Sequence, residues 1–444
     1  MSDSARLTGG SALLALADLA GASIAAGVIA RRRPVVGVLE RTQADKRAIT
    51  RMRRLRQQFG GRPVELVIPG RRIVVLTEPS DVGDVLAQTP TPFHPASWEK
   101  RHALTKFQPH GVLISRGSVR IQRRELNEAA LDSAAALHYL SSDFASVIEE
   151  EARAFATKVR ARGELDAAEF TTWWWQLVRR IVLGDAARDD DAVTDDLWYL
   201  RKSGNWSFLG RSRVRRRERF FDQLYAYADA ADPRSLIGAL ARLPASGTVD
   251  PVGQIPHWLF AFDAAGMATV RAAAVLAARP DDRHRCETDD LDRPAVRPFL
   301  RACVLESVRL WPTTPAILRE LTADTTLSGV QFGAGSSVLI AVPAFHRDPD
   351  LLTFANEFAP DIWLDGRAEQ YPQLVPFSAG PAECPGRNLV LFVTSTVLAN
   401  LFAQLHLESE SDLRLDSNHP LPATFNQFGV RLRATGLASL PRDA

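Results

Sequence analysis

The sequence predicts one mainly α-helical domain with small β-sheets, an α+β architecture. Apolar residues recur with helical spacing over most of residues 120–230. In VELVIPGRRIVVL, residues 64–76, apolar residues alternate instead and predict two strands joined by a turn at Pro69-Gly70. No repeat, low-complexity tract or linker divides the 444 residues. We therefore expect a single domain over 1–444, with a helical N-terminal extension over 1–40.

The remaining elements follow from local signals. A helix is expected after the strand pair, up to about residue 88, and another over TTWWWQLVRRIVLG at 171–184. Pro256 and Pro280 bound a helix over 257–279, which would be about 35 Å long. The other expected elements are a helix over 299–310, short strands around 324–342 and a helix after Cys384.

Composition favours a soluble globular protein, with 46% hydrophobic and 24% charged residues. The net charge of +2 gives no general attraction to nucleic acid, and the basic run at 211–220 is expected to be an exposed helix face. Cys286, Cys303 and Cys384 have no disulfide or metal spacing. These features predict a protein of a reducing compartment, the cytoplasm.

The N-terminal segment is long enough to raise the question of a membrane anchor. Between Leu7 and Ala30 the only charged residue is Asp18. An acidic residue at mid-span costs about 2.5–3.5 kcal/mol on insertion, and the segment is mostly Ala, Gly and Ser. It also lacks the layout of a signal peptide. We expect a packed or surface helix rather than a membrane span.

The stretch FSAGPAECPGRN, residues 377–388, places Cys384 in a Gly- and Pro-rich loop ahead of a long apolar run. Exposed N–H groups and the positive end of the next helix would favour a thiolate there. A thiolate serves as a nucleophile or as a metal ligand, whereas most buried free cysteines only pack. Nucleophilic catalysis needs a base, and no histidine lies nearby in sequence. An axial ligand to haem iron needs only a shielding loop.

These residues resemble the haem-ligand loop of the cytochromes P450. Phe377, Gly380, Cys384 and Gly386 match the family's Phe-x-x-Gly-x-Arg-x-Cys-x-Gly pattern, whereas Ala382 stands at its Arg position. Upstream, Glu306-Ser-Val-Arg309 resembles the family's Glu-x-x-Arg pair, whose members share one helix face. The segments 309–329 and 341–349 are also P450-like. The resemblance covers roughly residues 60–435 and implies the P450 fold.

The same resemblance gives the helix over 257–279 a role. Its Ala265-Gly266-Met267-Ala268-Thr269 matches the P450 stretch Ala/Gly-Gly-x-Asp/Glu-Thr, except that Ala268 replaces the acid. The resemblance implies Thr269 and Gly266 as candidate catalytic residues. The threonine would position dioxygen or a water, and small residues would leave room for the macrocycle. Close helix packing remains the alternative for Gly266. Asp263 lies about 120° away from Thr269 around the helix and is no substitute acid.

Haem propionates require cationic partners when buried. Arg120 and Arg124, one turn apart, match the family's propionate-binding helix, and Arg319 matches a third position. With Ala382 unable to donate, these three arginines are expected to hold the propionates, unless they are surface residues. Arg123 is a weaker candidate.

The family's Phe-x-Pro-x-Arg arginine, which joins the Glu-x-x-Arg pair, is replaced by Ile362. The network is expected to have two members, or Arg367 completes it.

The resemblance implies a haem-thiolate monooxygenase with haem b, in which Cys384 is the iron ligand. It would insert one oxygen atom of dioxygen into a small apolar substrate. The sequence carries no flavin or NAD signature, so electrons are expected from a ferredoxin-type donor and its reductase. The missing acid at 268 leaves open a peroxygenase, isomerase or dehydratase, and a non-catalytic haem sensor is a third possibility. Substrate recognition is expected in loops at 90–115, 200–215 and 425–430, with Phe428 as a roof or core residue.

Overall fold

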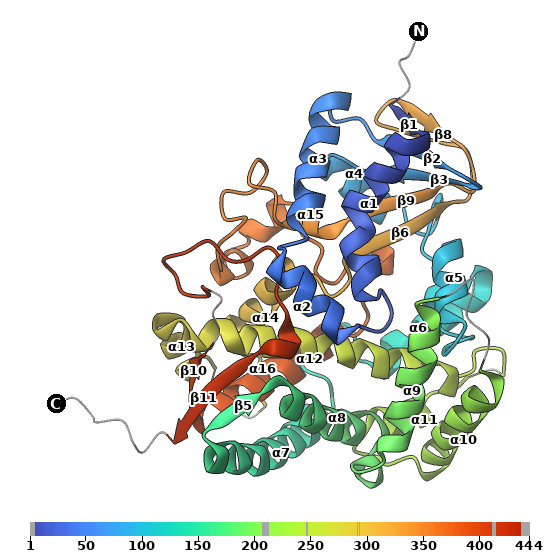
Figure 1. Ribbon diagram of the computed structural model, residues 1–444. Coiled ribbons are helices and arrows are strands. Elements are labelled where there is room, and N and C mark those ends of the chain that lie inside the picture. Colours follow the sequence, from blue (N-terminus) through green and yellow to red (C-terminus); the bar gives the residue numbers. More distant parts are fainter. Residues whose placement is uncertain are drawn as a thin grey trace.

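The structure is a computed structural model that describes residues 5–206, 213–245, 247–290, 292, 294–410 and 414–436. Figure 1 shows a sheet-containing part, with the N-terminal helices around it, above a larger helical part. The mainly helical prediction with small sheets is confirmed. The long helix α12 (Ile255–Ala277) crosses the middle of the molecule (Figure 1).

The largest sheet has six strands in the order β1-β2-β3-β9-β6-β4. The predicted strand pair is β2 (Val64–Ile68) and β3 (Arg71–Val75), which pair antiparallel across a turn where Gly70 has φ +73°. β3 pairs in parallel with β9 (Ser337–Ala341), which is buried along its whole length. The remaining strands are β1 (Arg6–Thr8), β4 (Phe93–His94) and β6 (Ala316–Leu321).

Two smaller sheets are built from short strands. One has the order β10-β11-β5 and joins Leu405–Ser409 and Arg431–Gly436 with Glu164–Asp166. The other pairs β7 (Thr325–Leu327) with β8 (Val330–Phe332). Strands were expected around 324–342, and β7, β8 and β9 confirm this. The strands β1, β4, β5, β6, β10 and β11 were not predicted, because each is short. β1, β4 and β5 also gain their partners from distant segments.

Helix α12 begins at Ile255 and has Pro256 in its first turn, where a missing N–H needs no partner. Its Ala-rich surface packs against α8 (Ala167–Leu183), α14 (Pro298–Leu310) and α16 (Arg387–Phe402). These four helices confirm the elements predicted at these places. The other helices are α2 (Arg33–Arg41), α3 (Lys46–Phe59), α4 (Pro79–Ala87), α5 (Trp98–Leu104), α6 (Gly117–Ala130), α7 (Ser141–Arg162), α9 (Asp191–Gly204), α10 (Val214–Ala230), α11 (Leu236–Ala241), α13 (Pro280–Glu287) and α15 (Val342–His346).

The N-terminal segment forms α1 (Gly9–Ala26), which packs on α3 and β2. Asp18 pairs there with Arg51, with the Arg51 Nη2 to carboxylate distance at 2.5 Å. The outer side of α1 leaves Leu13, Leu14 and Ile24 exposed. By length and apolar content, α1 and α12 both meet the requirement for a membrane-crossing helix, although α12 lies mostly inside the protein. That α1 spans no membrane therefore stays a prediction.

Candidate active site

The loop ahead of α16 holds Cys384 in a defined position. The Cys384 N–H donates to the Phe377 carbonyl oxygen at 3.0 Å. Gly380 has φ +65°, and a Cβ there would lie 2.3 Å from the Leu86 carbonyl oxygen, so only glycine fits. A Cβ on Gly386 would lie 4.0 Å from the Cys384 Sγ. The backbone of this loop therefore requires glycine at 380, whereas a Cβ at 386 would make only ordinary van der Waals contacts.

Opposing effects act on the pKa of the Cys384 thiol. Burial raises the pKa of the Cys384 thiol, and this outweighs the N–H of Gly386 and the charge of Arg124, which lower it. Burial therefore opposes the thiolate form that the loop N–H groups favour. Binding to a metal ion deprotonates such a thiol, so the thiolate character of this site depends on the ligand it takes.

Thr269 is fully buried in α12, and its hydroxyl donates to the Ala265 carbonyl oxygen at 2.8 Å. The neighbouring Ala268 carbonyl accepts a hydrogen bond of 2.9 Å from the Ser307 hydroxyl of α14. Asp263 binds Arg201 of α9 at 2.5 Å and is thus occupied. No acid on α12 takes the place of the one missing at position 268.

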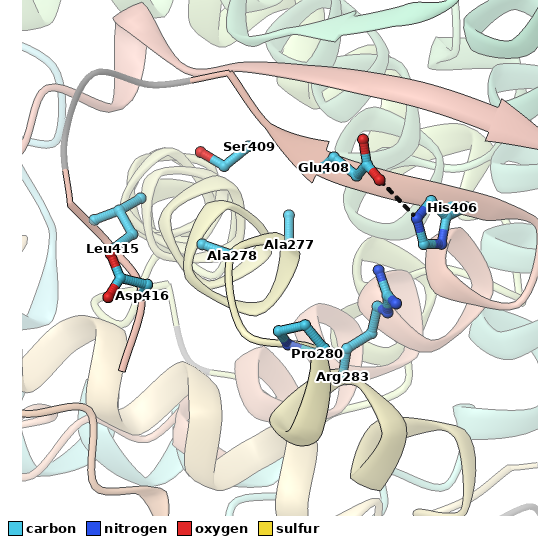
Figure 2. A pocket seen from close by; sticks show the side chains of 9 residues that line it. All are labelled: Ala277, Ala278, Pro280, Arg283, His406, Glu408, Ser409, Leu415 and Asp416. Carbon is cyan, nitrogen blue, oxygen red and sulfur yellow. Dashed lines mark hydrogen bonds and ion pairs between the residues drawn. The ribbon is translucent and has the colours of Figure 1, made fainter. Parts of the chain in front are cut away.

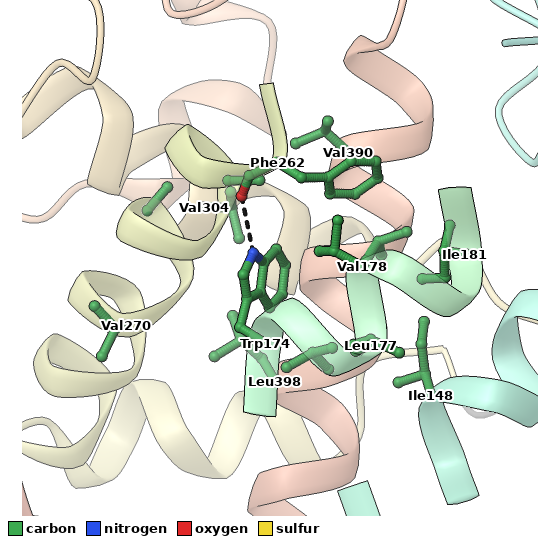
Figure 3. Packing of buried hydrophobic residues seen from close by; sticks show 14 of the residues in the cluster. Ile148, Trp174, Leu177, Val178, Ile181, Phe262, Val270, Val304, Val390 and Leu398 are labelled. Carbon is green, nitrogen blue, oxygen red and sulfur yellow. Dashed lines mark hydrogen bonds between the residues drawn. The ribbon is translucent and has the colours of Figure 1, made fainter. Parts of the chain in front are cut away.

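Gly266 faces the indole of Trp174 on α8. Figure 3 shows this ring directed at α12, where its Nε1 donates to the Phe262 carbonyl oxygen at 2.8 Å. A Cβ on Gly266 would lie only 2.8 Å from that nitrogen. This contact supports helix packing, the alternative that the sequence left open for Gly266, and a catalytic role of Gly266 stays a prediction.

Two of the three predicted arginines lie together without an acidic partner. Arg120 is 8% exposed and Arg319 is 2% exposed, and no ion pair joins either to a residue in the described part of the chain. The Arg319 guanidinium donates to hydroxyl groups of Thr89 and Ser378 at 3.1 and 3.3 Å. Burial and then the charge of Arg120 lower the pKa of Arg319 to about 10. Burial and then Arg124 lower the pKa of Arg120.

Arg124 has other partners. Its Nε pairs with Glu128 one turn along α6, and its Nη1 donates to the Glu383 carbonyl oxygen at 2.6 Å. Arg124 therefore ties α6 to the residue before Cys384. Arg123, the weaker candidate, donates instead to the Val249 carbonyl oxygen, away from this group.

Glu306 and Arg309 form a fully buried ion pair joined by two hydrogen bonds, with N–O distances of 2.7 and 2.6 Å. The Trp363 indole donates to Glu306 at 2.8 Å and completes the network. The expectation that Arg367 fills this place is wrong, because Arg367 pairs with Asp365 at 2.7 Å on the surface. Ile362 stands where the family has an arginine, and Trp363 follows it directly. The hydrogen-bond donor at the next residue was therefore the signal in the sequence.

Known proteins resemble this chain in sequence and in fold. The family model described as Cytochrome P450 matches residues 275–426. Two solved structures share the fold at a TM-score of 0.71 and 18% identity: "Retinoic acid bound cyanobacterial CYP120A1", over 87% of this chain and 94% of that one, and "Crystal structure of a Cytochrome P450 (CYP102L1)", over 88% and 94%. This chain belongs to the cytochrome P450 family.

Curated relatives of this P450 are similar over shorter segments. Cytochrome P450 4g15 of Drosophila melanogaster is 31% identical over 34% of the chain, and cyclooctat-9-en-7-ol 5-monooxygenase of Streptomyces melanosporofaciens is 28% identical over 40%. A 3-beta-hydroxylase of Tanacetum parthenium is 35% identical over 30%. The matched segments span 29%, 43% and 28% of these relatives' own lengths.

The family implies a haem-thiolate cofactor, and the residues of this P450 fit it. The Arg120 guanidinium has no hydrogen-bond partner among the residues that the structure describes, and its Nε is buried. Together with Arg319 it forms a buried cationic pair without an acidic partner among the described residues, which suits the two propionates. Cys384 presents a sulfur ligand in a loop with the family spacing. These residues would hold the group.

Elsewhere the structure has a surface groove of about 500 Å³ at the C-terminal end of α12 (Figure 2). Its lining includes Arg283, His406 and Asp416 and none of the predicted site residues. Among the expected substrate loops, 200–215 lies partly outside the described residues. Phe428 is half-buried and packs against the exposed Arg33 guanidinium, 5.2 Å from the ring centre, and both the roof and the core interpretation of this residue stay predictions.

Proposed function

We propose that this P450 is a monooxygenase that inserts one oxygen atom of dioxygen into a small organic substrate. The observation that carries the proposal is the joint arrangement of two elements: the loop of Cys384 leads into α16, and α16 packs against α12, which carries Thr269. Relatives named as monooxygenases and a hydroxylase support the same activity. The haem, when bound, supplies the activation of dioxygen.

The residues of the chain would bind and orient the haem, exclude water and offer a hydrogen-bond acceptor. Cys384 would ligate the iron through Sγ, and Arg120 and Arg319 would orient the macrocycle through its propionates. The apolar small residues of α12 would exclude bulk water. Thr269 keeps its hydroxyl proton on the Ala265 carbonyl oxygen, so its oxygen is free to accept a hydrogen bond from a water or substrate.

We assign haem b as the form of the cofactor and a ferredoxin-type protein with its reductase as the electron source. We also propose that the protein acts in the cytoplasm, with a substrate that is largely apolar. These assignments rest on the P450 resemblance and on the absence of a flavin or NAD signature in the 444 residues.

A peroxide-driven reaction is the second candidate, and one observation favours it. Ala268 stands where an acid relays protons in the family, and Asp263 is bound to Arg201. A peroxygenase uses an oxidant that already carries its protons, so it depends less on that relay.

The test uses purified protein with bound haem. Its reduced carbonyl complex should absorb at the long wavelength typical of thiolate-bound haem, and Cys384→Ala should lose this band. With a surrogate ferredoxin and reductase, product should depend on NADPH and dioxygen. Product formed only with hydrogen peroxide would favour the second candidate, and a Cys384→Ala protein that keeps the band would refute the ligand assignment.

A further inference from the structure

A second cavity, of about 70 Å³, lies between the N-terminal helices and the core of the protein. Residues of α1 and α2 form one side of it. The other side is formed by α12, by the segment that follows α14 and by residues 423–427. A single water requires roughly 10–15 Å³, so the cavity has room for a larger ligand.

Two arginines line this cavity, and both bind only uncharged acceptors among the described residues. Arg31 donates to two backbone carbonyl oxygens, at 2.7 and 2.8 Å, one of them that of Thr313. Arg271 of α12 donates to the Trp311 carbonyl oxygen at 2.7 Å and to Gln427 Oε1 at 2.6 Å. Because Trp311 and Thr313 belong to one short segment, the two guanidinium groups are held close to each other.

Asp45 is the one acidic residue of the lining, and it neutralises neither arginine directly. Its carboxylate accepts a hydrogen bond of 2.7 Å from the Thr424 hydroxyl, and no ion pair joins it to Arg31 or Arg271 in the described part of the chain. Burial and then the charge of Arg31 lower the pKa of Arg271 to about 9. With two arginines and one aspartate, the lining carries one positive charge in excess.

Two buried donors of the same lining are without an acceptor. Arg271 is 8% exposed and Gln427 is 2% exposed, and these side chains are hydrogen-bonded to each other. The Arg271 Nε and the Gln427 Nε2 have no hydrogen-bond partner among the residues that the structure describes. Buried donors normally have partners, so these two require an explanation, and a ligand that brings acceptors is one.

The remaining wall of the cavity is mostly apolar. It includes Ala22, Ala26, Val36, Leu39, Pro312 and Pro315. Apolar walls with a few convergent polar groups are typical of sites for small organic molecules. Arg271 follows Thr269 by two residues, so their side chains point about 160° apart around α12. The cavity therefore lies on another side of this helix than the candidate catalytic threonine.

We propose that this cavity binds a short-chain carboxylate, with its carboxylate group at Arg271 and Gln427 and its alkyl part against the apolar residues of α1 and α2. One negative charge balances the excess positive charge of the lining. The carboxylate oxygens accept charge-assisted hydrogen bonds from the two donors that are otherwise unpartnered. The ligand contacts the N-terminal helices and the core together, so its binding stabilises their docking. The site is independent of the proposed monooxygenase function.

The experiment is isothermal titration calorimetry of the full-length, haem-loaded protein at constant ionic strength. The probes are sodium propionate, propionamide and sodium chloride. Propionate should bind at one site with a dissociation constant of about 1 mM, as the binding free energy per atom of small ligands allows. Propionamide has a similar size and no charge, so it should bind about tenfold more weakly or worse. Chloride lacks the alkyl part and should also bind more weakly than propionate.

Three variants test the position of the site. Gln427→Glu keeps the oxygen that contacts Arg271 and supplies an internal negative charge, so it should abolish propionate binding. Ala22→Leu fills the cavity from α1 and should abolish binding as well. Ala17→Leu adds the same atoms on the exposed side of α1 and should leave the affinity unchanged. In the wild type, propionate should slow hydrogen exchange in α1 and α2, whereas in Gln427→Glu it should not.

Four results would overturn the proposal. These are no saturable binding of propionate to the wild type, equal affinities for propionate and chloride, unchanged binding by Gln427→Glu, and binding without slower exchange in α1 and α2. Propionate binding that shifts the Soret band and persists in Ala22→Leu would place the acid at the haem instead and would also overturn it. Gln427→Glu adds almost no volume, so the test remains decisive if Ala22→Leu does not fold.

Discussion

Replacing Gly266 with alanine tests the packing of α12 against α8. An added Cβ would lie 2.8 Å from Trp174 Nε1 and 2.9 Å from Cδ1. Trp174 is only 2% exposed and its Nε1 is bound to the Phe262 carbonyl oxygen, so the ring has little room to retreat. Overpacking of this kind costs about 1–3 kcal/mol.

Two further terms complete the expected effect of Gly266→Ala. Moving the indole strains its buried hydrogen bond, which adds about 1 kcal/mol or more. The better helix propensity of alanine offsets about 1 kcal/mol. The net expectation is a loss of about 2 kcal/mol, which corresponds to a Tm lower by about 2 °C for a chain of this length.

The assay is thermal unfolding of the haem-loaded protein, followed by circular dichroism and by Soret absorbance. Trp174→Phe in the Gly266→Ala background should restore part of the lost stability, because phenylalanine removes the atoms that clash. If glycine served only the macrocycle, alanine would raise the Tm and change the ligand spectrum. A Tm that rises or stays constant in Gly266→Ala would therefore refute the packing interpretation.

Three further predictions concern the remaining site residues. Replacing both Arg120 and Arg319 with glutamine should weaken haem retention on gel filtration, and retention equal to wild type would contradict their role. Trp363→Phe should lower stability in urea by about 1–3 kcal/mol through loss of a donor to a buried carboxylate, whereas Arg367→Ala should have little effect; the reverse order would contradict the network. Ala268→Asp should raise product formed per NADPH, since a relay of this kind contributes roughly 10²–10⁴-fold, and unchanged coupling at every pH would exclude position 268 from the proton path.

Local sequence signals were sufficient to predict the main helices and the loop of Cys384. Periodicity and proline positions predicted the elements that became α8, α12, α14 and α16, because helices depend mostly on residues three or four apart. The loop of Cys384 could also be predicted from the sequence. Gly380 is required there by its positive φ and by the close approach of its backbone to Leu86. Family spacing of Cys384, Glu306 and Arg309 then indicated the fold.

Contacts between distant segments could not be predicted in this way. The partner of Gly266 is Trp174, and the third member of the Glu306 network is Trp363. No periodicity relates such positions, because their meeting depends on how whole helices pack. The strand order could not be predicted for the same reason, since β5 joins β11 across more than half of the chain.

The sequence alone thus determined the helical character of the chain, the loop of Cys384 and the residues available for chemistry, because these follow from short-range spacing and backbone constraints. Only the tertiary structure decided the electrostatic state of those residues. Burial raises the pKa of the Cys384 thiol, and it lowers the pKa of Arg120 and of Arg319, which lie together without an acidic partner among the described residues. The reason is that desolvation and charge pairing depend on every neighbour within several ångströms, whatever its distance along the chain.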